Sequence, residues 1–135
     1  NAALALRGET GFTTVDLLQV DLFNGESVLY KFGAAPTYIR KGSQVRRLTG
    51  TSLPAGLDSG EQVRPDKTLL KLEPGDCVLM VSDGIVGTQD DQWLRDRLLQ
   101  FDGQSPKELA ASLITQTPEG ATDDRTALAV KIGKR

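Results

Sequence analysis

The sequence has no histidine in its 135 residues and a single cysteine, Cys77. The absence of histidine excludes Ser-His-Asp and Cys-His triads, most zinc sites and the commonest general base. A single cysteine excludes an internal disulfide framework and a zinc cluster built from thiolates. Because Cys77 stands inside an apolar run, we expect it to be a buried, unreactive thiol. Any chemistry in this chain must therefore rest on carboxylates.

A strong excess of charge and a long apolar run are also missing. The 16 Lys and Arg and 18 Asp and Glu give a net charge of −2, and no basic stripe with interleaved aromatic residues is present, which argues against a nucleic-acid partner. The most basic stretch, residues 38–48, alternates with apolar residues and is typical of a solvated hairpin edge. No apolar run approaches the ~20 residues of a membrane span, so we expect no membrane contact by this segment. The length suits one domain with a single core.

Alternating and uniformly apolar stretches predict a series of short strands separated by turn residues. We expect strands over the ranges 12–23, 27–33, 37–48 (a hairpin that turns at 41–43), 67–72, 77–81 and 126–132. Both faces of the strand at 12–23 should be at least partly covered, because apolar residues point to either side. Residues 49–66 are rich in Gly, Pro and Ser and predict a surface loop, with a flap as the alternative.

Two helices are predicted between the last two strands. The first begins at Thr88 or Asp90. Its inward face carries the apolar residues Trp93, Leu94, Leu98 and Phe101. The second begins at a capping box that consists of Ser105, Pro106 and Glu108. Hairpins followed by helices and a final strand indicate an α+β layered domain of antiparallel sheet covered by helices, rather than a doubly wound parallel sheet.

The apolar run at residues 77–81 ends abruptly at Ser82, Asp83 and Gly84. A carboxylate is among the costliest groups to remove from water, so its position at the end of a strand that looks buried needs an explanation. Gly84, next to it, permits a tight turn and a close approach of another backbone segment.

Two further carboxylates, Asp123 and Asp124, stand just before the final strand. If this strand neighbours the one that precedes Asp83, three carboxylates converge at one end of a sheet, where they repel one another unless a cation neutralises them. Oxygen ligands without His or Cys favour Mg²⁺ or Mn²⁺. The alternative is that Asp83 merely forms a turn and that Asp123 and Asp124 belong to a solvated loop.

The order of these motifs resembles a known family. The stretch LEPGDCVLMVSDGIVG, two helices and then ATDDRTALAVKI resemble the second half of the metal-dependent serine/threonine phosphatases of the protein phosphatase 2C superfamily. The upstream motifs FGAAP and LPAGL resemble those of its sporulation branch, whose type member is stage II sporulation protein E. The resemblance implies a layered α-β-β-α sandwich of antiparallel sheets with a centre of two Mn²⁺ or Mg²⁺ ions. This chain would be the C-terminal part of one such domain.

By position in the family's motifs, the resemblance assigns Asp83 and Asp123 as metal ligands. Asp124 falls where many members carry Asn, which implies a neighbouring or weaker group, and Gly84 matches the glycine whose backbone lies beside the metals. The family's first Asp-Gly motif should precede the helix that residues 1–7 would complete, and it is absent here. We therefore expect this segment alone to bind Mn²⁺ weakly and to show little phosphatase activity, whereas the complete domain would be active.

The resemblance also implies a substrate and a location. The substrate would be a phosphorylated regulatory protein that controls a sigma factor, and the parent protein would act in the cytoplasm, with a membrane anchor upstream in some forms. The rival interpretation is a non-catalytic, phosphatase-like module that docks a regulatory protein. Missing strands should uncover apolar sheet surface such as Leu18, Val20 and Val81, so we also expect self-association.

Overall fold

A computed structural model describes residues 11–56, 64–87, 90–103, 105–117 and 123–134. The chain forms two compact units: one contains Asn1–Ala34 and Gly50–Leu72, and the other contains Ala35–Thr49 and Glu73–Arg135. The helix expected at residues 1–7 lies outside the described residues.

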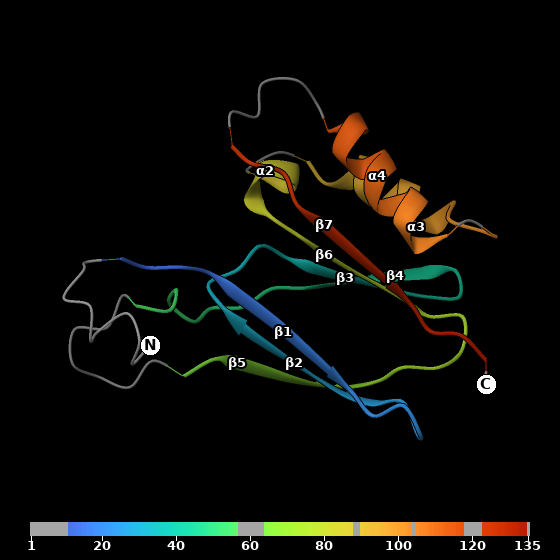
Figure 1. Ribbon diagram of the computed structural model, residues 1–135, viewed down its shortest axis with the longest axis horizontal. Helices are drawn as coiled ribbons and strands as arrows, with labels where there is room; N and C mark the ends of the chain where they lie inside the picture. Colours follow the sequence, from blue (N-terminus) through green and yellow to red (C-terminus); the bar gives the residue numbers. More distant parts are fainter. Residues whose placement is uncertain (1–10, 57–63, 88–89, 104, 118–122, 135) are drawn as a thin grey trace. The chain divides into compact units, whose positions relative to one another are not determined.

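The first unit contains an antiparallel sheet of three strands in the order β1-β2-β5 (Figure 1). Its strands are β1 (Val15–Val20), β2 (Glu26–Phe32) and β5 (Asp66–Lys71). The strand predicted over 12–23 is shorter than expected, because Leu22 and Phe23 lie in the turn to β2 and are 81% and 86% exposed. Both faces of this strand were predicted to be at least partly covered; Leu18 and Val20 on one face are half-buried, whereas Val15 and Leu17 on the other are 38% and 56% exposed.

The apolar side chains that this sheet exposes differ from the expected ones. Leu17 on β1 and Leu69 on β5 are 56% and 74% exposed, and their pairing with β2 places them on the same face. Leu18 and Val20, which were expected to be uncovered, are half-buried, and Val81 is buried. Apolar sheet surface is thus exposed at other positions than predicted, and self-association stays a prediction.

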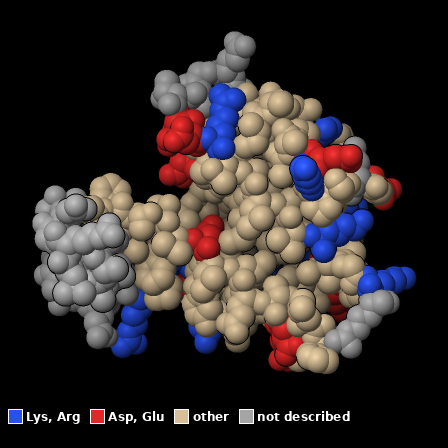
Figure 2. All heavy atoms as spheres, in the orientation of Figure 1, with Lys and Arg blue, Asp and Glu red and all other residues tan. Residues whose placement is uncertain are grey.

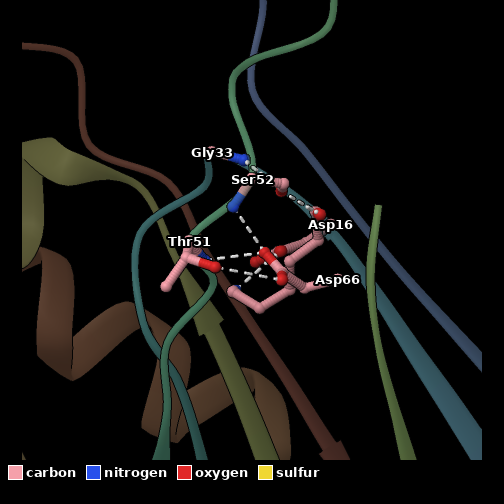
Figure 3. Close-up of polar contacts among 6 residues, drawn as sticks. Asp16, Gly33, Thr51, Ser52 and Asp66 are labelled. Carbon is pink, nitrogen blue, oxygen red and sulfur yellow. Dashed lines mark hydrogen bonds and ion pairs between the residues drawn. The ribbon is translucent and has the colours of Figure 1, made fainter. Parts of the chain in front are cut away.

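The Asp66 carboxylate fastens the start of β5 to Thr51 and Ser52 (Figure 3). It accepts hydrogen bonds from the backbone N–H groups of Thr51 at 2.7 Å and Ser52 at 2.6 Å. These bonds, that of Ser52 foremost, hold the pKa of the Asp66 carboxyl below its usual value. The two ends of the predicted loop are therefore tied together, whereas residues 57–63, on which the choice between loop and flap depends, lie outside the described part of the chain.

The second unit contains a four-stranded antiparallel sheet in the order β4-β3-β6-β7, with helices on one face (Figure 1). Its elements are β3 (Thr37–Lys41), β4 (Gln44–Leu48), β6 (Cys77–Val81), α2 (Asp83–Val86), α3 (Gln92–Leu99), α4 (Pro106–Gln116) and β7 (Ala127–Lys131). The predicted hairpin at 37–48 and the central strand at 77–81 are confirmed. The predicted fold class, α+β with antiparallel sheets, is confirmed as well. The single helical turn of α2 replaces the simple turn that the sequence predicts after Asp83.

The core of this unit lies between its sheet and its helices. All of β6 is buried, and Cys77, Leu79 and Val81 pack in one cluster with residues that include Leu94 and Leu98 of α3, Phe101 just after α3, and Leu109 and Leu113 of α4. Burial raises the pKa of the Cys77 thiol to about 11, which confirms a buried thiol. Ala127 and Ala129 are the β7 residues that pack against this core.

Both helices begin close to where the sequence predicts. At α4 the Ser105 hydroxyl accepts a hydrogen bond from the Glu108 N–H at 3.2 Å, and the Glu108 carboxylate accepts one from the Ser105 N–H at 3.4 Å, as in a capping box. At α3 the Asp90 carboxylate accepts from the Gln92 N–H at 3.0 Å. The other proposed cap, Thr88, lies outside the described residues.

Asp91, at the start of α3, ties this helix to the sheet. Its carboxylate accepts a hydrogen bond from the Tyr38 hydroxyl at 2.7 Å and one from Arg95 Nε at 3.1 Å, and it lies 3.5 Å from Arg47 Nε. Burial opposes its ionisation, but the Tyr38 bond and the two arginines outweigh that effect and lower the pKa of Asp91. Burial and the same carboxylate raise the pKa of Tyr38.

The charged surface is mixed. Acidic and basic side chains occur in small groups on the face that Figure 2 shows, in keeping with the nearly balanced charge. The solvated hairpin edge predicted for residues 38–48 is confirmed for β4, an edge strand whose Arg46 and Arg47 are exposed. It is wrong for β3, which pairs with β6 and buries Tyr38 and Ile39. Within the described ranges, no helix has both the length and the apolar character needed to span a membrane.

Candidate metal centre

The two segments that carry the candidate carboxylates lie next to each other at one end of the second unit's sheet. β6 and β7 are antiparallel neighbours, with Val81 opposite Ala127, so the end of β6 meets the start of β7. Asp83 follows β6, and Asp123 and Asp124 precede β7. The condition on which the sequence-based site depends, that these two strands are neighbours, is therefore fulfilled.

All three carboxylate-bearing residues are exposed to solvent. The chain leaves the buried strand before it reaches Asp83, so the desolvation cost that this residue suggested in the sequence does not arise. One oxygen of Asp123, Oδ1, accepts a hydrogen bond from the N–H of Asp124 at 2.8 Å, which orients that carboxylate along its own backbone. The three side chains reach the same end of the sheet but form no metal-binding cluster, since the described residues contain no such group of three or more His, Cys, Asp or Glu.

Gly84 lets the segment before β7 come close to α2. A Cβ atom at this position would lie 2.8 Å from the carbonyl carbon of Asp124 and 3.0 Å from the carbonyl oxygen of Asp123, and closer still to the carbonyl oxygen of Asp124. The φ angle of Gly84 is not positive, so backbone conformation does not require glycine here. Glycine is required here because the backbone of Asp123 and Asp124 leaves no room for a Cβ atom, as the sequence-based prediction of a close backbone approach implies.

Ser82 joins the same two segments through hydrogen bonds. Its N–H donates to the carbonyl of Thr126 at 3.0 Å, its hydroxyl accepts from the N–H of Thr126 at 2.9 Å, and the hydroxyl donates to the carbonyl of Asp124 at 3.1 Å. Sequence reasoning gives this residue no role. The available signal is a hydroxyl side chain at the point where an apolar strand passes into Asp-Gly.

The donor chemistry at this sheet end fits a hard divalent cation. The candidate groups are carboxylate oxygens, which Mg²⁺ and Mn²⁺ prefer, and they are open to solvent. Asp83 and Asp123 come from two different segments that meet at this end of the sheet. Such ions take about six ligands, so the remaining ones must come from water or from residues outside the described part of the chain.

Two antiparallel sheets with helices match solved domains of the protein phosphatase 2C class. The phosphatase domain of the cell fate determinant SpoIIE from Bacillus subtilis, presoaked with Mn, is similar with a TM-score of 0.75 and 27% identity, over all of this chain and 63% of that one. The catalytic domain of the serine/threonine phosphatase PstP in complex with 2 manganese ions shares the fold, with a TM-score of 0.79 and 21% identity, over 98% of this chain and 66% of that one.

The match to a particular family within that class covers almost the entire chain. The family model described as stage II sporulation protein E (SpoIIE) matches residues 1–133, and the chain belongs to this family. Stage II sporulation protein E of Bacillus subtilis (strain 168) is 30% identical over 142 residues, which cover 98% of this chain and 17% of that relative. The chain thus spans less than a fifth of the length of that relative. The family match confirms the resemblance that the sequence motifs indicated.

Proposed function

We propose that this chain is part of a metal-dependent protein serine/threonine phosphatase domain. Family membership and the likeness to a solved phosphatase domain support this proposal. The observation that carries it is the junction of Ser82–Gly84 with residues 123–126, which keeps Asp83 and Asp123 at the same end of the sheet.

In this proposal Asp83 and Asp123 are ligands of Mn²⁺ or Mg²⁺, with two ions in the complete domain. Asp124 is a neighbouring group that supports the site, and Gly84 provides the close backbone approach. When bound, such ions lower the pKa of water and neutralise charge on a phosphoryl group undergoing in-line displacement. This chain contributes two carboxylates from neighbouring segments, and the rest of the domain supplies the remaining ligands. The chain alone should therefore bind Mn²⁺ weakly and hydrolyse little substrate.

The proposed substrate is a phosphoserine on a regulatory protein of the kind that controls a sigma factor. Membership of the sporulation family supports this choice, since one solved relative is described as a cell fate determinant. We place the domain in the cytoplasm, where such a regulator would be found, and we allow for a membrane anchor elsewhere in the parent protein.

The test compares the complete domain with its Asp83→Asn variant on a phosphoserine protein, with and without Mn²⁺. Removing one ligand charge should lower turnover by more than about 100-fold, beyond the usual effect of losing a group that only supports a ligand. Asp102→Asn is the matched control, because Asp102 is an exposed carboxylate of the same unit outside the candidate site. Equal activity of wild type and Asp83→Asn would refute the metal assignment. A wild-type domain that binds the phosphoprotein without hydrolysing it would refute the enzyme and favour a docking module.

A further inference from the structure

Ser82 lies where β6 ends and α2 begins, so its backbone groups are needed both for pairing with β7 and for the first hydrogen bond of the helix. The paired register of β6 and β7 runs to Val81 and Ala127, and the next opposed pair is Ser82 and Thr126. In a hydrogen-bonded antiparallel pair, each residue donates its N–H to the carbonyl of the other. The first of these bonds is present, from the Ser82 N–H to the Thr126 carbonyl at 3.0 Å.

The reciprocal bond is made by a side chain instead of the backbone. The Ser82 carbonyl accepts from the N–H of Ile85 at 3.0 Å, and thereby begins the helical turn of α2. The N–H of Thr126 donates to the Ser82 hydroxyl oxygen at 2.9 Å. The hydroxyl therefore takes the place of the carbonyl, and the strand pairing continues for one residue beyond the point where the chain turns into α2.

The same hydroxyl group also donates a hydrogen bond. It donates to the carbonyl of Asp124 at 3.1 Å, so one oxygen atom holds the backbone at both Asp124 and Thr126. Ser82 directly precedes Asp83, and Asp124 directly follows Asp123. The hydroxyl is thus a side-chain link between the two backbone stretches from which the candidate ligands project.

We propose that Ser82 is a positioning residue for the metal centre, a role that rests on the proposed phosphatase function. Its hydroxyl sets the separation of Asp83 and Asp123 without itself touching the metal or the substrate. Alanine cannot make either side-chain bond, whereas threonine carries a hydroxyl on the same carbon and can make both. The geometry therefore predicts that Ser82→Thr retains the site and Ser82→Ala does not.

The experiment measures Mn²⁺ affinity of the complete domain from the electron paramagnetic resonance signal of free Mn²⁺. Wild type is compared with Ser82→Ala, Ser82→Thr and Ser112→Ala, and metal-free thermal unfolding of each protein is recorded. Ser112 is the matched control, because its hydroxyl also donates to a carbonyl, that of Leu109 at 2.8 Å, and also accepts a bond, from Arg97 Nε at 3.3 Å.

We expect Ser82→Ala to weaken Mn²⁺ binding by about 10–100-fold, with Ser82→Thr within about threefold of wild type and Ser112→Ala unchanged. Wild-type affinity in Ser82→Ala would overturn the positioning role and leave the proposed function intact. Equal losses of affinity in the two alanine variants, in proportion to their losses of thermal stability, would also overturn it. A wild-type domain that binds no Mn²⁺ would overturn the proposed function, and this inference with it.

Discussion

Replacing Gly84 by alanine tests whether close packing of α2 against residues 123–124 holds the candidate site together. Two effects oppose each other in this variant. Gly84 lies inside α2, where alanine is favoured over glycine by up to about 1 kcal/mol. The added methyl group, however, would lie 2.8 Å from the carbonyl carbon of Asp124. Non-bonded carbon atoms keep about 3.5 Å or more between them, so this contact is too short.

The magnitude follows from what would have to move. The atoms that the methyl group meets belong to the backbone, which cannot rotate aside as a flexible side chain does. The carbon contact alone requires α2 or the segment before β7 to shift by about 0.7 Å, and the closer contact with the carbonyl oxygen of Asp124 requires a larger shift. Overpacking of this kind costs about 1–3 kcal/mol. A clash of this depth with backbone atoms lies near the upper end of that range, so after subtraction of the helix gain of up to about 1 kcal/mol we expect Gly84→Ala to lower the free energy of unfolding by about 2 kcal/mol.

Urea unfolding of the metal-free complete domain measures this change. Gly133→Ala is the control, because a Cβ atom at Gly133 meets nothing within 4 Å and its φ angle is not positive. We expect the control to unfold like wild type, and Gly84→Ala to lose Mn²⁺ affinity in addition to stability. A Gly84→Ala domain as stable as wild type, or more stable, would show that helix propensity dominates and that the two segments do not pack closely.

The remaining predictions concern one hydrogen-bonded carboxylate in each unit. The bonds from Ser52 and Thr51 lower the pKa of Asp66 in the folded chain, so its stabilising effect should be complete above about pH 4 and disappear as the pH falls through the folded-state pKa. Urea unfolding at a series of pH values should show this loss in wild type but not in Asp66→Asn; parallel profiles would contradict it. Tyr38→Phe removes the 2.7 Å bond to Asp91 and should cost about 1.5–3 kcal/mol of unfolding free energy, while raising the pKa of Asp91. An unchanged Asp91 titration by NMR would contradict that reasoning.

Most strands could be predicted because their residues alternate or are uniformly apolar. Residues 77–81 have no polar face, and the structure buries all of them. The end of β1 could not be predicted in this way, since Leu22 and Phe23 continue the apolar pattern into the turn. There the Asp21 carboxylate accepts a hydrogen bond from the N–H of Phe23 at 2.8 Å, and such a local bond competes with strand pairing without altering the hydrophobic pattern.

The candidate site could be predicted as residue types but not as geometry. Oxygen donors and family resemblance pointed to Asp83 and Asp123, and their assignment as ligands stays a prediction. Their exposure depends on where the chain leaves β6, and α2 has 4 residues, too few for a helical period to show in the sequence. The role of Ser82 depends on which backbone groups of the segment before β7 lie opposite it, and the local sequence pattern around Ser82 does not indicate them.

The bonds of Asp66 to Thr51 and Ser52 have a consequence for how this domain can vary. They join Thr51 and Ser52 to the first residue of β5, so the start of β5 is held by contacts that do not involve the residues between them. Each doubling of a flexible loop adds only about 0.6 kcal/mol to its closure cost. Sequence inserted between Ala55 and Asp66, such as an epitope tag, should therefore leave the pairing of β5 with β2 in place.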